Sequence, residues 1–292
     1  MQLLKSILPI GISLGLASCA FAPGAAMGGS PHGAPAPQSA PPRVATSLAP
    51  WVLQPSILKS APVVVRREEA ALAILERQVW QKSHPDALRL AVEAYWRYRS
   101  AYPAEVRKPY LYYVDFGLDS RTPRGYVFDM DALEIVDGPF TVAHGRGSAR
   151  GLHGVPTRFT NIKDSNATSL GLYLAEETYA FRGTAAGRRY RSIGLRLKGV
   201  SGPFNDAARE RGIVVHGAPY VTPEQAGRSE GCPAMEPERA ERLIPMIAEG
   251  GMVFHFSPYD TRWLQEDPWV GMHSPRLAGG GMDPDDGPVM GG

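Results

Sequence analysis

The chain has 292 residues, of which 43% are apolar and 21% are charged, so it can bury a full core as one large domain or two small ones. Its formal net charge of +2 argues against a nucleic-acid-binding protein, which would need a concentrated basic face. The two cysteines, Cys19 and Cys232, cannot form a disulfide framework, and we expect no disulfide.

Residues 1–19 have the composition of a secretion signal. Lys5 precedes an apolar run, residues 7–17, which is too short to span a bilayer comfortably but long enough for the core of a signal peptide. The Leu-Ala-Ser-Cys sequence that ends at Cys19 resembles the lipobox of bacterial lipoproteins, whose cysteine is lipidated. Ordinary cleavage after Ala22 is the alternative. In both cases we expect an exported, periplasmic protein, and in the first case Cys19 anchors it to the membrane.

The next two segments differ in pattern. Residues 20–62 contain nine prolines and two charged residues without an apolar period, which predicts a disordered tether. Residues 63–104 carry apolar side chains at helical spacing in two groups: Leu72, Leu75 and Val79, then Leu88, Ala91, Tyr95 and Tyr98. Between the groups, Ser83 and Asp86 flank a proline in the manner of a capped helix start. We therefore expect a helical hairpin that packs beside the following domain.

Residues 105–260 have the pattern of a β domain. Short β-prone segments alternate with Gly, Pro, Asp and Ser turns, which is typical of an antiparallel sheet or sandwich; the candidate strands are residues 111–116, 125–130, 133–136, 140–144, 193–197 and 251–257. A helical pattern over residues 236–248 precedes the last strand. The glycine-rich residues 261–292 predict a disordered tail.

The residues with the clearest chemical potential are His216 and Cys232. The apolar run 213–215 predicts that His216 ends a buried strand and that Gly217 turns the chain. Cys232 lies close to the start of the helix expected at residue 236, where the positive end of the helix dipole favours a nucleophilic thiolate. The alternative is a buried structural cysteine beside a core histidine. The spacing and the flanking glycines favour a nucleophile and its base.

This segment resembles the L,D-transpeptidases of bacterial cell-wall synthesis, in which a His-Gly pair precedes a Ser-x-Gly-Cys motif. The match is closest to the divergent branch described as a murein L,D-transpeptidase catalytic domain, which has Gly-Arg-Ser, a variable residue and Gly-Cys-Pro-Ala, as residues 227–234 do. The resemblance implies that Cys232 is the acyl-enzyme nucleophile, that His216 is its base, and that Gly231 belongs to the turn whose amides face the oxyanion. It further implies that a backbone carbonyl orients the imidazole.

The same resemblance implies a fold that is mainly β with flanking helices (α+β). We expect an L,D-transpeptidase-like β-sandwich that the helical hairpin precedes. One position departs from the better-known branch, since Glu230 stands where that branch has a histidine. A carboxylate that pointed inward would raise the pKa of the neighbouring thiol, so we expect Glu230 to point to solvent.

Several further residues are candidates for holding a peptide substrate. Arg228 and Ser229 lie close to Cys232 in the sequence. His144, which also precedes a glycine, Asn161 and Ser169 correspond to other segments of the same family branch. An arginine-rich stretch is either a solvated face or a guanidinium fork for the carboxylates of an anionic stem peptide; it comprises Arg182, Arg188, Arg189, Arg191 and Arg196.

The expected function follows from the resemblance. It implies a transferase that forms a thioester with a peptidoglycan stem peptide, releases D-alanine and passes the acyl group to an amine. Two alternatives stay open: an L,D-carboxypeptidase or amidase, in which water replaces the amine, and a non-catalytic wall-binding lipoprotein. No histidine or cysteine spacing typical of a metal site occurs, and we expect neither a metal nor a cofactor. The expected partners are stem peptides and a membrane, with no nucleic acid, and the protein is expected to be a monomer.

Overall fold

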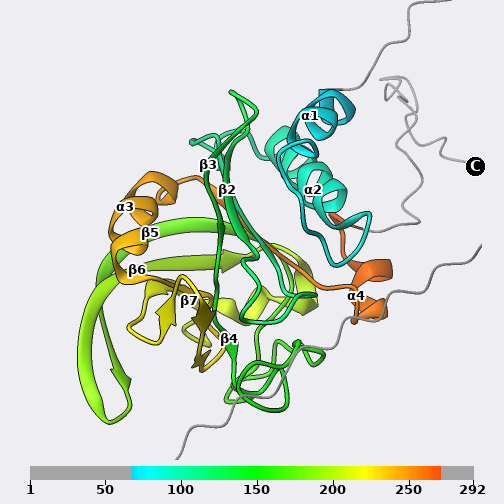
Figure 1. Ribbon diagram of the computed structural model, residues 1–292. Coiled ribbons are helices and arrows are strands. Elements are labelled where there is room, and N and C mark those ends of the chain that lie inside the picture. Colours follow the sequence, from blue (N-terminus) through cyan, green and yellow to red (C-terminus); the bar gives the residue numbers. More distant parts are fainter. Residues whose placement is uncertain (1–66, 271–292) are drawn as a thin grey trace, which may run out of the picture. The chain divides into compact units, whose positions relative to one another are not determined.

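The computed structural model describes residues 67–270. The core of these residues is an eight-stranded sheet in the order β11-β7-β6-β5-β12-β1-β2-β3, with helices packed against both faces (Figure 1). The predicted sheet-dominated α+β class is therefore confirmed. The predicted signal segment with Cys19, the predicted tether and the greater part of the predicted tail lie outside the described residues.

The strands of this sheet come from most of the described chain. They are β1 (Tyr110–Asp115), β2 (Gly125–Asp129), β3 (Glu134–Phe140), β5 (Gly171–Ala185), β6 (Arg188–Gly199), β7 (Val214–Gly217), β11 (Ala234–Met235) and β12 (Met252–Phe256). Two short ladders lie outside it, formed by β4 (His144–Gly145) with β10 (Arg228–Ser229) and by β8 (Val221–Thr222) with β9 (Gln225–Ala226). The helices are α1 (Arg67–Leu75), α2 (Ala87–Ala101), α3 (Pro237–Ile247) and α4 (Thr261–Glu266), with short 3₁₀ turns at Gly202–Phe204 and Asp206–Ala208.

The sheet is mixed rather than antiparallel as predicted. Hairpin neighbours such as β5 and β6 are antiparallel, but β1 pairs with β12, and β7 with β11, in parallel. Parallel neighbours need long crossover connections, and these connections carry the irregular loops between β7 and β11. The turn residues that suggested an antiparallel sheet or sandwich therefore belong partly to crossovers.

Both faces of the sheet are buried, as the alternation of side chains along β1 makes clear. Leu111 and Tyr113 point into the core beneath α1 and α2. Tyr112 and Val114 point into the opposite core, which includes side chains of α3. All four side chains are fully buried, which is what a strand in the middle of a sheet requires when both faces are covered.

The two helices predicted before the sheet are present as α1 and α2, but the helix start between them differs from the prediction. Ser83 does not cap α2, because its amide and its hydroxyl donate to the carboxylate of the buried Asp115, at 2.8 and 2.5 Å. Asp86 stands at the N-cap without a side-chain cap bond and accepts from Arg89 Nε at 2.9 Å. Ser83 thus ties the helical hairpin to the end of β1.

The predicted disordered tail is wrong for residues 261–270. This segment contains α4, and Trp263 is fully buried against Phe254 and Phe256, with ring centroids 6.0 and 5.9 Å away. The Trp263 indole donates to Asp267 at 2.8 Å, which satisfies its one polar group. The glycine-rich composition begins only after this segment, at Gly271. Among the described helices, none has the length and apolar character that crossing a membrane requires.

The sequence pattern predicted only residues 193–197 of the long hairpin of β5 and β6. β5 runs for 15 residues, and its outer part pairs only with β6, so the hairpin projects from the sheet (Figure 1). Ala186 and Gly187 form its tip with φ of 46° and 76°, the left-handed conformations of a two-residue hairpin turn. Because polar residues face solvent on much of this hairpin, no continuous apolar pattern marked it.

Replacing Ser83 by alanine should destabilise the protein by about 1–3 kcal/mol, because a buried carboxylate loses a hydrogen-bond donor that offsets its desolvation. Urea unfolding followed by circular dichroism measures the change. Ser100→Ala, at an exposed position of α2, is the control and should change the free energy of unfolding by less than about 0.5 kcal/mol. Equal midpoints for S83A and the unmodified protein would contradict the importance of the link to Asp115.

Candidate active site

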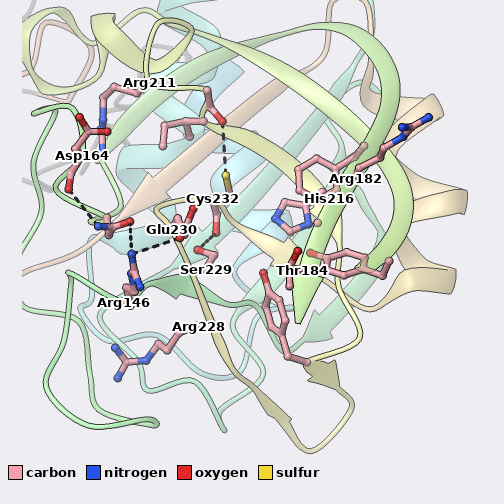
Figure 2. A pocket seen from close by; sticks show the side chains of 17 residues that line it. Arg146, Asp164, Arg182, Thr184, Arg211, His216, Arg228, Ser229, Glu230 and Cys232 are labelled. Atoms are coloured by element: carbon pink, nitrogen blue, oxygen red, sulfur yellow. Dashed lines mark hydrogen bonds and ion pairs between the residues drawn. The ribbon is translucent and has the colours of Figure 1, made fainter. Parts of the chain in front are cut away.

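A cavity of about 660 Å³ lies between the β5–β6 hairpin, β7 and the loop that carries Cys232 (Figure 2). His216 and Cys232 both line it, and so do Arg228 and Ser229. The parallel pairing of β7 with β11 brings the first two together, because Ala234 lies opposite His216 in the ladder. His216 and Cys232, which the loop containing β8, β9 and β10 separates in the sequence, therefore line the same cavity.

His216 is held as a neutral imidazole. Its side chain is buried, and its ring stacks on Phe181 with centroids 4.1 Å apart and planes inclined by 14°. Nδ1 lies 3.0 Å from the carbonyl oxygen of Gly217. Because a carbonyl only accepts, Nδ1 carries the proton and Nε2 is left bare. Burial lowers the pKa of His216 to about 4, against the opposing effect of the Gly217 hydrogen bond.

The turn before Cys232 requires glycine. Gly231 has a φ of +121°, and a Cβ at this position would come within 2.9 Å of the Ile213 side chain and 3.0 Å of the Ala167 carbonyl oxygen. An L-residue would be strained by the backbone conformation and would also clash with these neighbours. The sequence Gly-Cys therefore reflects a steric constraint on the turn.

The thiol of Cys232 is in its neutral form near pH 7. Burial raises its pKa to about 11, an effect that the Val214 amide and the charge of Arg211 reduce but do not cancel. Sγ donates to the Gly212 carbonyl oxygen at 3.8 Å. The predicted thiolate is wrong, because burial raises the pKa of the thiol; in the chain, β11 lies between Cys232 and α3.

Ser229 shapes the cysteine turn from inside. Its hydroxyl donates to the Cys232 carbonyl oxygen at 2.6 Å and accepts from the Gly231 amide at 3.2 Å. Thr168 supports the same turn, since its hydroxyl donates to the Gly231 carbonyl oxygen at 3.2 Å and accepts from the Gly145 amide at 2.9 Å. The Gly231 amide is therefore engaged, which is contrary to the expectation that it faces an oxyanion.

Arg228 lines the cavity, and two of its three guanidinium nitrogens are occupied, whereas Nη2 is buried without a hydrogen-bond partner among the described residues. Nε donates to the Leu152 carbonyl oxygen at 2.9 Å, and Nη1 donates to that of Ala149 at 3.1 Å. These bonds hold the loop that follows β4. The arrangement gives Arg228 a positioning contact in place of the free guanidinium that the sequence suggested.

The other three substrate-binding candidates do not line this cavity. His144 is buried and accepts from Arg124 Nη2 at Nδ1, at 2.8 Å. The Asn161 amide donates to Asp206 at 2.6 Å. The Ser169 hydroxyl bonds that of Tyr173 at 2.8 Å. All three belong to the scaffold around the site rather than to its wall.

Glu230 points to solvent, as expected from the sequence. Its side chain is 78% exposed, and Oε1 lies 3.4 Å from Arg146 Nη2. Its charge raises the pKa of the Cys232 thiol less than burial does. No group of three potential metal-ligating side chains occurs within residues 67–270.

Comparison with known proteins places the chain in a family. The family model of the L,D-transpeptidase catalytic domain matches residues 80–256. The chain belongs to this family. A comparison with curated proteins finds no significant match.

Solved structures of L,D-transpeptidases have low similarity to this chain. The Mycobacterium smegmatis enzyme has 16% sequence identity and a TM-score of 0.31, over 51% of this chain and 59% of that one. The Mycobacterium tuberculosis H37Rv enzyme has 16% identity and a TM-score of 0.31, over 51% and 58%. The Stackebrandtia nassauensis enzyme has 16% identity and a TM-score of 0.32, over 58% and 68%. The chain thus spans about three fifths of the two mycobacterial enzymes.

Several cavity residues of this L,D-transpeptidase domain were missed by sequence analysis. Phe181, Tyr190 and Tyr220 surround His216 or line the cavity beside it. The alternation of aromatic residues before Arg182 was the available signal for Phe181. Arg211 was missed too; its guanidinium donates to backbone carbonyl oxygens at 2.8 and 2.7 Å and lies on the cavity wall.

For the acyl transfer proposed below, the rate of acylation should stay flat from neutral pH down to about 5 and then fall as the pH drops through about 4. His216 accepts a proton only while it is neutral, and burial has lowered its pKa to about 4. The measurement is the rate of thioester formation with a carbapenem, followed by intact mass, with circular dichroism as the control for folding at each pH. An acid limb near the ordinary histidine pKa of about 6.5 would contradict this account.

Proposed function

We propose that this protein is a cysteine-dependent peptidoglycan L,D-transpeptidase. In this proposal Cys232 forms an acyl-enzyme with a stem peptide, D-alanine leaves, and the acyl group passes to an amine. The observation that supports it most directly is the bare Nε2 of the buried His216 in the cavity that Cys232 also lines. Nucleophilic catalysis needs a nucleophile, a base and a group that orients the base, and the Gly217 carbonyl supplies the last of these.

The first step begins with the thiol turning from Gly212 toward His216. Sγ gives its proton to Nε2 and attacks the carbonyl carbon of the donor residue. The C–N bond then breaks, the amine of D-alanine takes the proton from Nε2, and a thioester remains. Because the pKa of the thiol is high and that of His216 is low, the proton moves as the C–S bond forms rather than beforehand.

The oxyanion of the tetrahedral intermediate needs donors that are not already used. The Gly231 amide bonds Ser229 Oγ, and Pro233 has no N–H group. We assign this role to the amide of Cys232 itself. The role of Gly231 is then to permit the turn that presents this amide.

In the second step an amine attacks the thioester, the C–S bond breaks, and the proton lost by the amine returns to sulfur through His216. An L,D-carboxypeptidase differs only in using water. The order of the residues along the chain, histidine before cysteine, disfavours papain-like peptidases, in which the cysteine comes first. We further propose that the protein is an exported monomer, lipid-anchored through Cys19, that acts on peptidoglycan stem peptides.

His216→Ala and Cys232→Ala should each remove nearly all turnover of a tetrapeptide muropeptide, and the double variant should lose little more than either single one, because the two groups act in the same step. Steady-state assays of D-alanine release measure this. His84→Ala, which lies outside the cavity, is the control and should retain turnover. Losses that add up across the two sites would argue against a joint role, and unchanged turnover in C232A would exclude the cysteine mechanism.

Given tetrapeptide muropeptides, the protein should make dimers cross-linked between two diaminopimelate residues, and C232A should make none. Water is present at about 55 M, so an amine wins only if the enzyme holds it at high effective concentration beside the thioester. Mass spectrometry of the products distinguishes transfer to an amine from hydrolysis by water. Tripeptide as the only product would replace the transferase with the L,D-carboxypeptidase, and the absence of both products would favour a non-catalytic wall-binding protein.

A further inference from the structure

The cavity has two sides of different chemistry (Figure 2). His216 and the aromatic rings lie on one side of Cys232, whereas Arg146, Asp164 and Glu230 gather on the other. Arg146 Nη2 lies 3.4 Å from Glu230 Oε1, and the two side chains are 62% and 78% exposed. Arg146 Nη2 also donates to Asn166 Oδ1 at 3.2 Å. The charged side therefore presents one cation, Arg146, with the anions Glu230 and Asp164 on the same side.

The remaining arginines of the cavity are less available. The Arg211 guanidinium donates to the carbonyl oxygens of Thr160 and Ala167, and that of Arg228 is held by the loop after β4. The Arg182 guanidinium points away from Cys232 in Figure 2. The accessible charge beside the nucleophile is thus mixed rather than cationic. A purely anionic ligand would be repelled by Glu230 as strongly as it is attracted by Arg146.

An exposed ion pair of this kind stabilises the fold by at most about 1 kcal/mol. Arg146 and Glu230 can therefore break their ion pair and bind a ligand instead, at a small cost in free energy. A ligand that carries an ammonium and a carboxylate on the same carbon offers both replacements at once. Glu230 would accept from the ammonium, and the planar guanidinium of Arg146 would donate to the carboxylate.

We propose that Arg146 and Glu230 form a subsite for the zwitterionic side-chain end of the donor residue that acylates Cys232; this rests on the acyl transfer proposed above. Residue 230 is two positions from Cys232, a stretch of at most about 7 Å of chain. In a diamino acid such as diaminopimelate, five carbon–carbon bonds join the reacting carbonyl carbon to the carbon that carries the ammonium and the carboxylate, a span of about 6 Å. The span of the diamino acid is comparable to the chain stretch between residues 230 and 232. The subsite can therefore hold the charged end of the side chain while the carbonyl carbon lies at Cys232.

Three donor tetrapeptides test the subsite, alike except at the third residue. One has diaminopimelate, the second has diaminopimelate with its side-chain carboxylate amidated, and the third has lysine, which keeps the ammonium alone. The rate of thioester formation is followed by intact mass and divided by the rate with a carbapenem, which lacks this side chain. We expect the unmodified protein to prefer the free diaminopimelate donor over the other two by about tenfold.

Glu230→Gln should lower the ratio of diaminopimelate donor to carbapenem about tenfold, and it should lower the ratio for lysine as well. Arg146→Gln should lower the ratio for free diaminopimelate to that of the amidated donor and leave the lysine ratio as it was. The matched controls are Arg262→Gln and Glu266→Gln, which break a comparably exposed ion pair on α4. Both should keep the ratios of the unmodified protein.

Unchanged ratios in both cavity variants, or no preference among the three donors in the unmodified protein, would overturn the subsite. A loss for lysine in R146Q equal to that for diaminopimelate would overturn the assignment of Arg146 to the carboxylate. These outcomes differ from a failure of the proposed function. In that case no donor and no carbapenem would form a thioester with Cys232 at all.

Discussion

The cavity depends on the short parallel ladder between β7 and β11. It sets Ala234 opposite His216, and so fixes where Cys232 can stand relative to the imidazole. Two residues of pairing would be a weak constraint alone, but the turn before the ladder has its own hydrogen bonds from Ser229 and Thr168. An anchored turn leaves little freedom in the position of Sγ, which is what a reaction sensitive to small displacements requires.

Burial at this ladder also determines the protonation of the pair. His216 is buried and Cys232 is partly buried. Loss of water disfavours their charged forms, which lowers the pKa of His216 and raises that of Cys232. A resting pair of thiol and neutral imidazole follows, in place of a thiolate and an imidazolium. A neutral pair has a smaller desolvation penalty than two buried charges. In the proposed reaction, the thiol gives its proton to His216 only when a carbonyl carbon is present to bond with the sulfur.

Sequence analysis succeeded where the information was local. The strand before His216, the glycine before Cys232 and α3 all follow from short patterns of apolar and glycine residues. It failed where a residue distant in the sequence determines which hydrogen bonds form. Ser83 has the right neighbours to cap a helix, yet the buried Asp115 takes both of its hydrogen bonds. The support that the Thr168 hydroxyl gives to the Gly231 carbonyl oxygen is likewise invisible in local sequence, because 63 positions separate the two residues.

The two His-Gly pairs show how far local sequence can mislead. His144 begins β4 and His216 is the next-to-last residue of β7, and each precedes a glycine, so the local sequence around the two is alike. At His216, Nδ1 faces the Gly217 carbonyl, an acceptor, so the proton sits on Nδ1 and Nε2 is free to act as a base. At His144, Nδ1 faces the guanidinium of Arg124, which can only donate, so Nδ1 accepts and the proton must sit on Nε2. While this bond lasts, His144 has no ring nitrogen free to accept a proton. The hydrogen-bond partner of Nδ1 therefore determines which of the two histidines can act as a base.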